Sequence, residues 1–517
     1  MTTSTSSEQA AAPPAVEVTP AATAELTSTA TIDAAPPRDA ARARAAEPTL
    51  ASRLVVFVLC AAVVLSALAF GTVHPWALAI FQAGAGLVVL LWAADAWAAR
   101  RLRFSRSLLQ LPLAGLFVVG VVQMLPLGGA TAPVAGLQSD AARAASLDPY
   151  MTRMTLVQLA ALAVYFSAAL VFIDTPKRLR TVVRVLIIFC ALLALFALMQ
   201  YFLNPEQIYW LRQPRFARPF GPFVNRHHFA SYMLLAAGLP LGLLFAGAVR
   251  KDLLPLYAFA AVLTGSALVA TISRGGLLGL GAEVLFLAGL SAFARRKSAR
   301  AEGGGAGGHP LLRRAGLQLA FGLALIVGVL AFAGDELLSR TAETITSGNV
   351  TSDRTTFWRG AREIIRERPW LGAGLGAFGV AYTRHDPTPG AARLDQAHND
   401  YLQILADAGI VGGLLGLIFL VSLFRQGFAR AGSHDKFRRG VAAGALSGCF
   451  GVLVHSFFDF PLHLAGIALL FFVLAALATA DGRVEEAEAP RRRRRRRHAG
   501  ETPPRPADSE SLKEAVS

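Results

Sequence analysis

Long apolar runs separated by short polar segments repeat along the chain from about residue 50 onward. Each run is about 20 residues long, the length that a helix needs to cross a hydrocarbon core of roughly 30 Å. The pattern predicts about twelve membrane-spanning helices, at approximately 54–71, 76–98, 108–126, 154–173, 181–202, 227–249, 253–272, 275–294, 313–333, 408–425, 439–458 and 462–480. The predicted fold class is therefore an all-α polytopic membrane protein.

The segments outside these runs divide the rest of the chain. Residues 1–50 are rich in Ala, Thr, Pro and Ser and cannot bury a core, so we expect a disordered tail. Residues 481–517 are polar and include seven consecutive arginines, which favour contact with anionic lipid head groups. Between the tails we expect helices one to nine at 51–333, a large loop at 334–407 and helices ten to twelve at 408–480.

Composition agrees with a membrane protein. Of the 517 residues, 54% are hydrophobic and only 16% are charged, whereas a soluble domain carries roughly 25% charged residues. A net charge of +16 would indicate a nucleic-acid partner in a soluble protein, but here much of it sits at the ends of apolar runs and in the C-terminal block. No nucleic-acid partner is expected. The three cysteines lie inside apolar runs without disulfide or metal-type spacing.

Basic residues set the predicted orientation. Loops rich in Lys and Arg stay in the cytoplasm, and here a basic group lies before the first span and after every even-numbered one: Arg53; Arg100, Arg101, Arg103, Arg106; Lys177, Arg178, Arg180; Arg250, Lys251; Arg295, Arg296, Lys297; Arg425, Arg430, Arg438, Arg439; Arg491 to Arg497. We therefore expect a bacterial inner-membrane protein with both termini in the cytoplasm. The opposite side holds the loops at 72–75, 127–153, 203–226, 273–274, 334–407 and 459–461.

The loop at 334–407 contains a short amphipathic segment. Between Arg354 and Arg368, apolar residues recur at helical spacing on one face, and Pro369 ends the pattern. This segment predicts a helix that lies on the membrane surface.

Arginines on the extracytoplasmic side are candidates for anion binding. Arg274 sits in a tight turn between two spans, where a charge is costly unless it faces water or a partner. It either reaches the interface along its aliphatic stem or binds an anion, because a guanidinium fork suits a diphosphate. Arg215 and Arg218 add positive charge in the preceding long loop, or are ordinary surface charges.

His398 is the candidate general base, because an imidazole titrates near neutral pH. A single loop histidine is more often structural, and only the surrounding pattern favours a functional role. Asn399 or Asp400 can cap the helix that follows.

Two patterns carry less weight. Gly374-Leu-Gly376-Ala-Phe-Gly379 matches a dinucleotide fingerprint but lacks the strand–helix context, so we interpret it as a turn. His455, Asp459 and His463 are spaced by four, but Pro461 interrupts any helix between them, so no metal site is expected. Asp459 remains a candidate for hydrogen bonding in the site.

Several of these pieces, in this order, resemble the O-antigen ligase/polymerase (Wzy-C) superfamily. The pieces are Pro219-Phe-Gly221 up to Asn225, Ser273-Arg274-Gly275, Arg354-Thr-Thr-Phe-Trp358, Arg368-Pro369-Trp370-Leu-Gly372-Ala-Gly374, His398-Asn399-Asp400-Tyr401-Leu402 with Gly409-Ile410-Val411-Gly412, and His455-Ser-Phe-Phe-Asp459-Phe-Pro461. The His-Asn-x-Tyr-Leu block is the most specific, and the resemblance covers roughly residues 50–480. His227-His228 stand where the family often has Asn.

The resemblance implies a GT-C-like membrane glycosyltransferase with about twelve helices and a large periplasmic loop that carries short amphipathic helices. Such enzymes move a glycan from an undecaprenyl-diphosphate carrier to an acceptor hydroxyl, with inversion and without metal or other cofactor. In this sequence the catalytic candidates are His398 and Arg274. The substrate-binding candidates are Arg215, Arg218, Asn225, Arg354, Asn399 and Asp459.

The acceptor stays open at this point. A ligase would use lipid A-core, and a polymerase of O-antigen or exopolysaccharide repeats would use another carrier-linked glycan; relatives that glycosylate proteins also exist. Membrane lipids surround the protein in each case. A small-solute transporter is the alternative from another class, although transporters usually bind at the midplane with charges deep in their spans. A structural scaffold is the last alternative.

Overall fold

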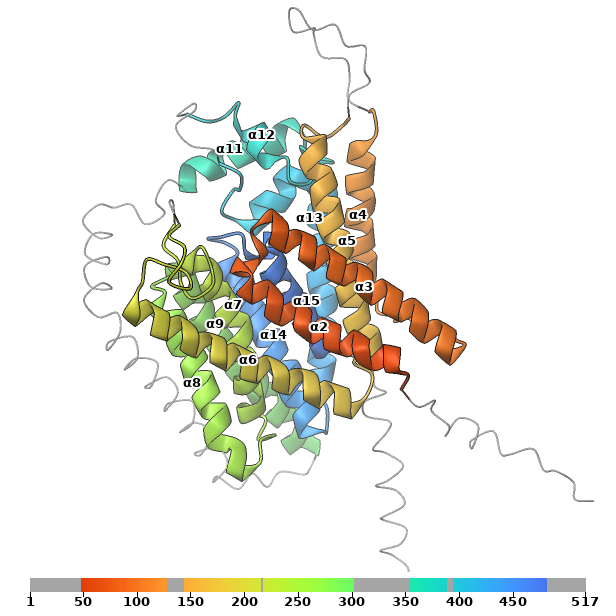
Figure 1. Ribbon diagram of the computed structural model, residues 1–517, viewed down its shortest axis with the longest axis vertical. Helices are drawn as coiled ribbons and strands as arrows, with labels where there is room; N and C mark the ends of the chain where they lie inside the picture. The colour runs from red at the N-terminus through yellow and green to blue at the C-terminus, as the bar shows by residue number, and fades with distance from the viewer. Residues whose placement is uncertain (1–47, 128–143, 215–216, 302–353, 388–393, 481–517) are drawn as a thin grey trace, which may run out of the picture. The chain divides into compact units, whose positions relative to one another are not determined.

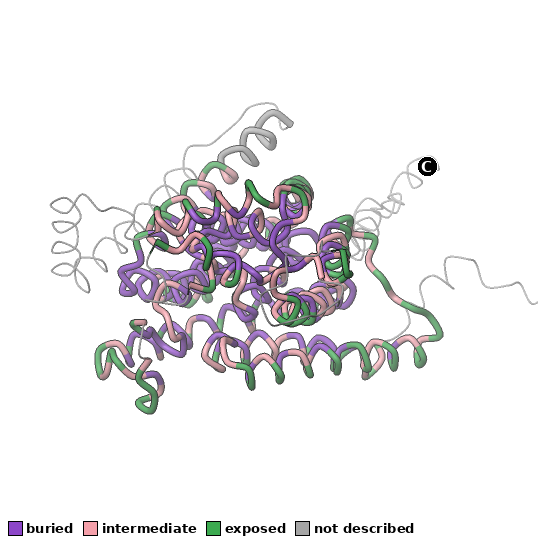
Figure 2. The backbone as a smooth tube through the Cα atoms, turned by 90° about the horizontal axis from the view of Figure 1, so that it is seen from above, coloured by how far each residue is buried: buried purple, intermediate pink, exposed green. Residues whose placement is uncertain are grey.

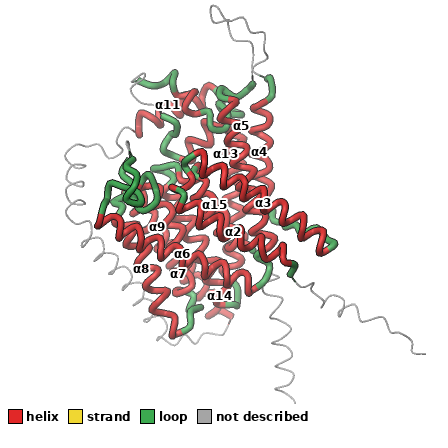
Figure 3. The backbone as a smooth tube through the Cα atoms, viewed as in Figure 1, coloured by secondary structure: helices red, strands yellow, loops and turns green. Residues whose placement is uncertain are grey.

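The computed structural model describes residues 48–127, 144–214, 217–301, 354–387 and 394–480. Within these ranges the chain forms helices and turns and no strand (Figure 3). The elements in chain order are α2 (Leu50–Leu68), η1 (Phe70–Thr72), α3 (Pro75–Ala99), α4 (Gln110–Met124), α5 (Pro149–Phe172), α6 (Pro176–Leu203), α7 (Arg226–Phe245), η2 (Lys251–Leu253), α8 (Leu254–Ala270), α9 (Arg274–Ala301), α11 (Arg354–Glu367), α12 (Phe378–Tyr382), α13 (Asp400–Ala431), α14 (Lys436–His455), η3 (Pro461–His463) and α15 (Ala465–Thr479) (Figure 1).

Most predicted spans correspond to observed helices. In the part of the chain that the structure describes, nine helices are long and apolar enough to cross a membrane, and two shorter apolar helices, α4 and α15, join them. The predicted span at 313–333 lies outside the described residues. The other eleven predicted spans each coincide with one helix.

Many helices begin where the sequence supplies a cap. Thr49, Asp148, Thr175, Asn225 and Asn399 each precede a helix and accept a hydrogen bond from a backbone N–H of its first turn. Such a side chain satisfies one of the N–H groups that the helix itself leaves unpaired. Proline occupies the first helical position of α3, α5 and α6, where its missing N–H costs nothing.

Helix α7 lies at the centre of the helices that build the site. Every residue of α7 from His228 to Phe245 is buried. Figure 2 shows buried residues in the middle of the helix assembly and exposed residues along its outer helices. It packs most closely against α14, where glycines face one another. A Cβ on Gly444 would lie 2.3 Å from the carbonyl oxygen of Gly238. Small residues of this kind let two backbones approach in a membrane, which brings the start of α7 and the end of α14 close together.

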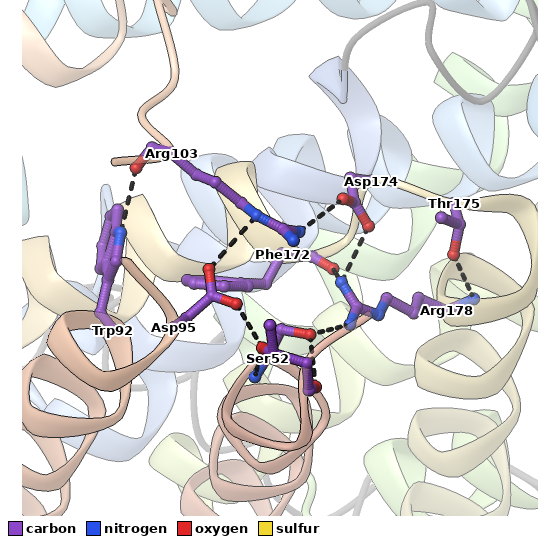
Figure 4. Close-up of polar contacts among 9 residues, drawn as sticks. Ser52, Trp92, Asp95, Arg103, Phe172, Asp174, Thr175 and Arg178 are labelled. Carbon is purple, nitrogen blue, oxygen red and sulfur yellow. Dashed lines mark hydrogen bonds and ion pairs between the residues drawn. The ribbon is translucent and has the colours of Figure 1, made fainter. Parts of the chain in front are cut away.

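A network of ion pairs lies on the side that the basic residues assign to the cytoplasm (Figure 4). The guanidinium of Arg103 lies 3.2 Å from Asp95 and 3.4 Å from Asp174, and Arg178 lies 2.9 Å from Asp174. Arg178 also donates to the hydroxyl of Ser52, 2.6 Å away. The network therefore ties the first turn of α2, the end of α3 and the connection between α5 and α6 to one another.

The amphipathic segment after residue 354 is helical, as predicted, but its apolar face does not point to lipid. Gly360, Ala361 and Ile364 of α11 are buried, and the apolar residues pack in a cluster with residues of α12 and α13 such as Phe378 and Ala406. The expectation of a helix whose apolar face lies on the membrane is therefore wrong, because protein already covers that face.

Helix α13 begins earlier than the predicted span at 408–425. It starts at Asp400 and breaks at Gly409, whose φ of 63° is a conformation that favours glycine. The N–H of Ile410 donates to the carbonyl of Pro369 over 2.7 Å, so the segment after α11 holds this break. The first turns of α13 thereby extend towards α11 and α12, which lie together at this end of α13 (Figure 1).

Candidate active site

Five chain segments that are distant in sequence meet where α13 begins. They are the starts of α7, α9, α11 and α13, and the segment between α14 and α15. His398, Asp459, Arg354 and Arg274 come from four of these segments, and all four were candidates from sequence. The contacts described below bring the four side chains into one cluster.

His398 is held between two aromatic rings in a strained turn. Its φ is 51°, which is uncommon for a residue with a side chain. The ring centroid of Phe460 lies 4.9 Å away and that of Phe357 lies 5.8 Å away. Nδ1 of His398 lies 3.5 Å from Oδ1 of Asp459, a distance typical of an ion pair and too long for a regular hydrogen bond. The imidazole is 28% exposed, so a second molecule can reach it.

Asp459 is a buried carboxylate among positive and polar groups. It is 1% exposed, and its Oδ2 has no hydrogen-bond partner among the described residues. Burial alone would raise the pKa of Asp459, but the neighbouring imidazole of His398 and the three further histidines at the site hold that pKa well below its usual range. Asp459 is therefore ionised at neutral pH and can stabilise a positive charge on His398.

Arg354 and Arg274 lie close enough to influence each other. Burial lowers the pKa of Arg354, the positive charge of Arg274 lowers it further, and the charge of Asp459 opposes both. The guanidinium of Arg354 nevertheless stays charged at neutral pH, because the ordinary pKa of arginine is so high. Arg274 is exposed and is the first residue of α9, where the helix dipole adds partial positive charge. Together these groups form a positive region suited to an anion.

A layer of histidines supports the turn that carries Arg274. Nδ1 of His227 lies 2.9 Å from the hydroxyl of Ser273, which also accepts from the N–H of Gly276 over 3.2 Å. Nδ1 of His455 lies 2.6 Å from the hydroxyl of Ser231. The ring of His455 approaches the backbone so closely that a Cβ on Gly275 would lie 2.5 Å from it. This packing fixes the start of α9 and hence the position of Arg274.

Asp400 and Asn399 organise the segment that carries Asp459. Asp400 accepts from the hydroxyl of Ser456 over 2.8 Å, and its other oxygen lies 2.7 Å from Nδ1 of His463. Asn399 caps α13 and donates to the carbonyl of Phe457 over 3.1 Å. Burial opposes the charge of His463, but its bond to Asp400 and the further charge of Asp407 raise its pKa above the ordinary value. Asn399, and not Asp400, is therefore the cap of α13, and the polar atoms of the Asn399 side chain are hydrogen-bonded to backbone groups.

Two of the remaining candidates, Asn225 and Arg218, lie at the start of α7. Asn225 caps α7 by accepting from the N–H of His227 over 2.9 Å. Arg218 is exposed, and its carbonyl accepts from the N–H of Arg226 over 2.9 Å, so its loop lies against the start of α7. Arg215 lies outside the described residues. Helix α14 ends at His455, so no single helix carries His455, Asp459 and His463. Among the described residues, no group of His, Cys, Asp and Glu side chains has the arrangement of a metal site.

Sequence reasoning missed the supporting histidines. His227 and His228 were noted only as departures from a family pattern, and His455 only as part of an interrupted repeat and of one family piece, with no role assigned to any of them. The pairing of His227 with Ser273 and of His455 with Ser231 leaves no signal in the sequence, because the two pairs are 46 and 224 residues apart. Only the packing of α7 against α9 and α14 brings them together.

Comparisons with known proteins relate part of this chain to one family. The family model for O-antigen ligase (Wzy_C) matches residues 259–417, a range that contains Arg274, Arg354 and His398. The chain is also 25% identical over 272 residues to an O-antigen ligase of Pseudomonas aeruginosa, a match that covers 53% of this chain and 56% of that relative. The chain thus matches about half the length of this curated relative. The resemblance found in the sequence is confirmed, and residues 259–417 of this multi-pass membrane protein match the O-antigen ligase (Wzy_C) family.

Proposed function

We propose that the protein is a membrane glycosyltransferase of the O-antigen ligase type. It would move a glycan from an undecaprenyl-diphosphate carrier to a hydroxyl of lipid A-core on the periplasmic side. The observation that carries the proposal is the meeting of two arginines, Arg274 and Arg354, with the His398–Asp459 pair at one site. These are the two parts that such a transfer needs, namely positive charge for a diphosphate leaving group and a base for the acceptor.

In the proposed reaction, the acceptor oxygen attacks the anomeric carbon of the carrier-linked sugar while the bond from that carbon to the diphosphate breaks. His398 accepts the proton of the attacking hydroxyl through Nε2, because Nδ1 is turned towards Asp459. The carboxylate of Asp459 holds the ring and stabilises the imidazolium that forms, as the aspartate of a catalytic triad does. A single displacement of this kind inverts the anomeric configuration.

The arginines act on the leaving group. Charge grows on the diphosphate oxygens as the glycosidic bond breaks, and donors already in place stabilise it without reorganisation. Arg274 and Arg354 supply this stabilisation in the proposal, which is the role that a divalent ion takes in metal-dependent transferases. The proposed reaction therefore needs no metal, and we expect transfer by the purified protein to continue in the presence of EDTA.

The orientation of the site rests on the basic residues. The ion-paired arginines Arg103, just after α3, and Arg178, in the first turn of α6, lie at the opposite ends of the helices from the cluster. The positive-inside rule assigns such residues to the cytoplasm. The cluster then faces the periplasm, with both chain ends in the cytoplasm. Labelling single cysteines placed at Arg384 and Asp252 with a membrane-impermeant reagent tests this, and labelling of the Asp252 site alone in intact cells would overturn it.

The direct test is transfer by His398→Gln and Arg274→Gln, compared with Arg250→Gln. Arg250 is an exposed arginine at the other end of the helices, paired with Asp252 at 2.8 Å, so its substitution controls for loss of a surface charge. We expect His398→Gln to lower transfer by roughly 10²–10⁴-fold, Arg274→Gln to raise the donor KM or lower kcat, and the control to transfer normally. Normal transfer by the first two variants would contradict their assigned roles.

The glycan profile of a deletion strain separates the ligase from the polymerase. Loss of capped lipopolysaccharide with accumulation of long carrier-linked chains supports a ligase. Loss of all long chains with accumulation of single repeats would instead identify a polymerase, which uses the same catalytic groups with a different acceptor.

A further inference from the structure

A cavity of about 340 Å³ lies between α4, α5, α13 and α15. Its volume falls in the range of pockets that hold small ligands. Its apolar lining comes from all four helices and includes Leu113, Leu162, Leu420 and Phe472. Among the described residues that line it, none is Arg274, Arg354, His398 or Asp459. This space, which we call the α13 cavity, therefore lies outside the charged cluster of the candidate active site.

The α13 cavity reaches the exposed side of α13. Gly416 and Leu417 line it, and both residues are exposed. They belong to a helix that is long and apolar enough to cross a membrane, where exposed apolar residues meet hydrocarbon chains. A Cβ on Gly416 would meet no atom within 4 Å. A hydrocarbon chain can therefore enter the cavity here directly from the bilayer.

The lining of the cavity changes from polar to apolar along α13. Asp400, Tyr401 and Asp407 line its first part, and from Gly412 to Leu420 every lining residue of α13 is apolar or glycine. The stretch from Gly412 to Leu420 covers about 12 Å along a helix, close to the ~15 Å that one leaflet contributes to the hydrocarbon core. The α13 cavity thus has the polarity of a lipid with its head group towards the candidate active site and its chain towards the middle of the bilayer.

The polar part of the cavity carries negative charge. Asp400, Asp407 and His463 line it, and Asp400 lies 2.7 Å from Nδ1 of His463. Oδ2 of Asp407 accepts from Gln403 over 3.0 Å and from the N–H of Gly376 over 3.1 Å, which favours the ionised carboxylate. Oδ1 of Asp407 is buried and has no hydrogen-bond partner among the described residues. Even with His463 protonated, the two carboxylates leave one negative charge, and a donor is missing at Oδ1.

We propose that the α13 cavity binds one acyl chain of an aminophospholipid, whose ammonium group lies at Oδ1 of Asp407. The ammonium supplies both the positive charge and the N–H donor that this oxygen lacks. Nε2 of His463 binds the lipid phosphate, because Nδ1 faces Asp400 and the imidazole is 28% exposed. A head group that carries only phosphates does not fit, because the two carboxylates repel it. The occupant is therefore a lipid of the surrounding bilayer and not a substrate.

The bound lipid acts on the candidate active site through Asp400. This carboxylate accepts from the hydroxyl of Ser456 over 2.8 Å and from the N–H of Leu462 over 3.3 Å, and both residues also line the cavity. They flank Asp459 in the segment between α14 and α15. A lipid in the cavity thereby fixes the segment that holds Asp459, whatever reaction the site performs.

The test is photo-crosslinking of the full-length protein in phosphatidylcholine nanodiscs. The probes are phosphatidylethanolamine, phosphatidylcholine and phosphatidylglycerol, each with a diazirine on one acyl chain, and mass spectrometry identifies the labelled residues. We expect the ethanolamine probe to label the apolar lining, such as Phe472, at least about tenfold more than the other two. The reason is that only its ammonium group can donate charged hydrogen bonds.

Two variants locate the binding site. Gly416→Leu places a side chain at the opening and should abolish labelling of the lining by the ethanolamine probe. Its control is Gly281→Leu in α9, at an exposed glycine that also meets nothing within 4 Å and does not line the cavity; labelling should be unchanged. Asp407→Asn should remove the preference for the ethanolamine probe over the choline probe.

Equal labelling of the lining by all three probes, or undiminished labelling in Gly416→Leu, would overturn the proposal. Displacement of the probe by an undecaprenyl-diphosphate glycan, but not by unlabelled phosphatidylethanolamine, would show that the cavity holds a substrate instead. The comparison of the three probes uses the wild type alone, so it decides the matter even where a variant fails to fold. Crosslinking needs no glycan transfer, so its result does not depend on the proposed function.

Discussion

Replacement of Asp459 by asparagine tests whether His398 and Asp459 act as a pair. Asparagine keeps the shape of the side chain and removes its charge. The carboxylate is buried and lies 3.5 Å from Nδ1 of His398, so its loss deprives the imidazolium of its nearest counter-charge. The proposed reaction creates that imidazolium only when the acceptor loses its proton, so the effect should fall on kcat.

The distance gives the size of the effect. Two unit charges 3.5 Å apart attract each other by about 5 kcal/mol at an effective dielectric constant of 20. Each 1.4 kcal/mol corresponds to a factor of ten, and only part of the charge has developed in the transition state. We therefore expect kcat to fall on the order of 10²–10³-fold. The donor KM should not rise, because the substitution leaves Arg274 and Arg354 in place and removes a negative charge from the neighbourhood of the donor diphosphate.

Asp400→Asn is the matched control. Asp400 is also a buried carboxylate beside a histidine, 2.7 Å from Nδ1 of His463, but it has no role in the proposed proton transfer. Steady-state transfer is measured for both variants well below their unfolding temperatures, where the folded fraction is equal. A kcat of Asp459→Asn within tenfold of the wild type, or an equal loss in Asp400→Asn, would refute the pairing of Asp459 with His398.

Two further predictions concern stability, measured as the thermal unfolding midpoint in detergent. Because the pKa of His463 is raised in the folded protein, its charged form contributes its full stabilisation at pH values below the ordinary pKa of 6.5. This stabilisation is lost as the pH rises through the raised value. The midpoint should fall as the pH rises above 6.5, and His463→Gln should weaken that dependence; an unchanged slope would contradict the ion pair with Asp400. Gly444→Ala should destabilise by about 1–3 kcal/mol, because its methyl group would lie 2.3 Å from the carbonyl of Gly238. Gly416→Ala, which meets nothing within 4 Å, should be neutral or slightly stabilising, and equal midpoints for the two variants would contradict the close helix contact.

The helices could be predicted from the sequence with good accuracy. A helix that crosses a bilayer must be apolar over its whole length, so each span leaves a local signal that does not depend on its neighbours. Caps such as Thr175 and prolines such as Pro176 marked where helices begin. The start of α13 was placed eight residues late, at 408 instead of Asp400, because its first turns lie beyond the apolar run and are held by contacts to α11 and the segment after it.

The candidate site was predictable only in part. Arg274 stood out because a charge in a tight turn between two spans is costly and needs a reason, and His398 because an imidazole titrates near neutral pH. Asp459 was noted in a spaced pattern of polar residues, and Arg354 entered only through the family resemblance. Asn225 and Asn399 carried the same polar signal, yet the structure shows them as helix caps. A polar side chain at a helix start has the same sequence signature whether it binds a substrate or the backbone, and only the positions of its partners distinguish the two.

The sequence by itself thus determined an all-helical membrane architecture, most helix limits and a short set of polar candidates, because these depend on local hydrophobicity and local backbone needs. The tertiary structure decided which candidates meet. It placed His398 beside Asp459, brought Arg354 within electrostatic range of Asp459 and Arg274, and packed the apolar face of α11 against protein instead of lipid. These outcomes depend on the glycine-lined packing of α7 with α14 and on the break at Gly409. Such contacts join residues far apart in the chain, and no local pattern records them.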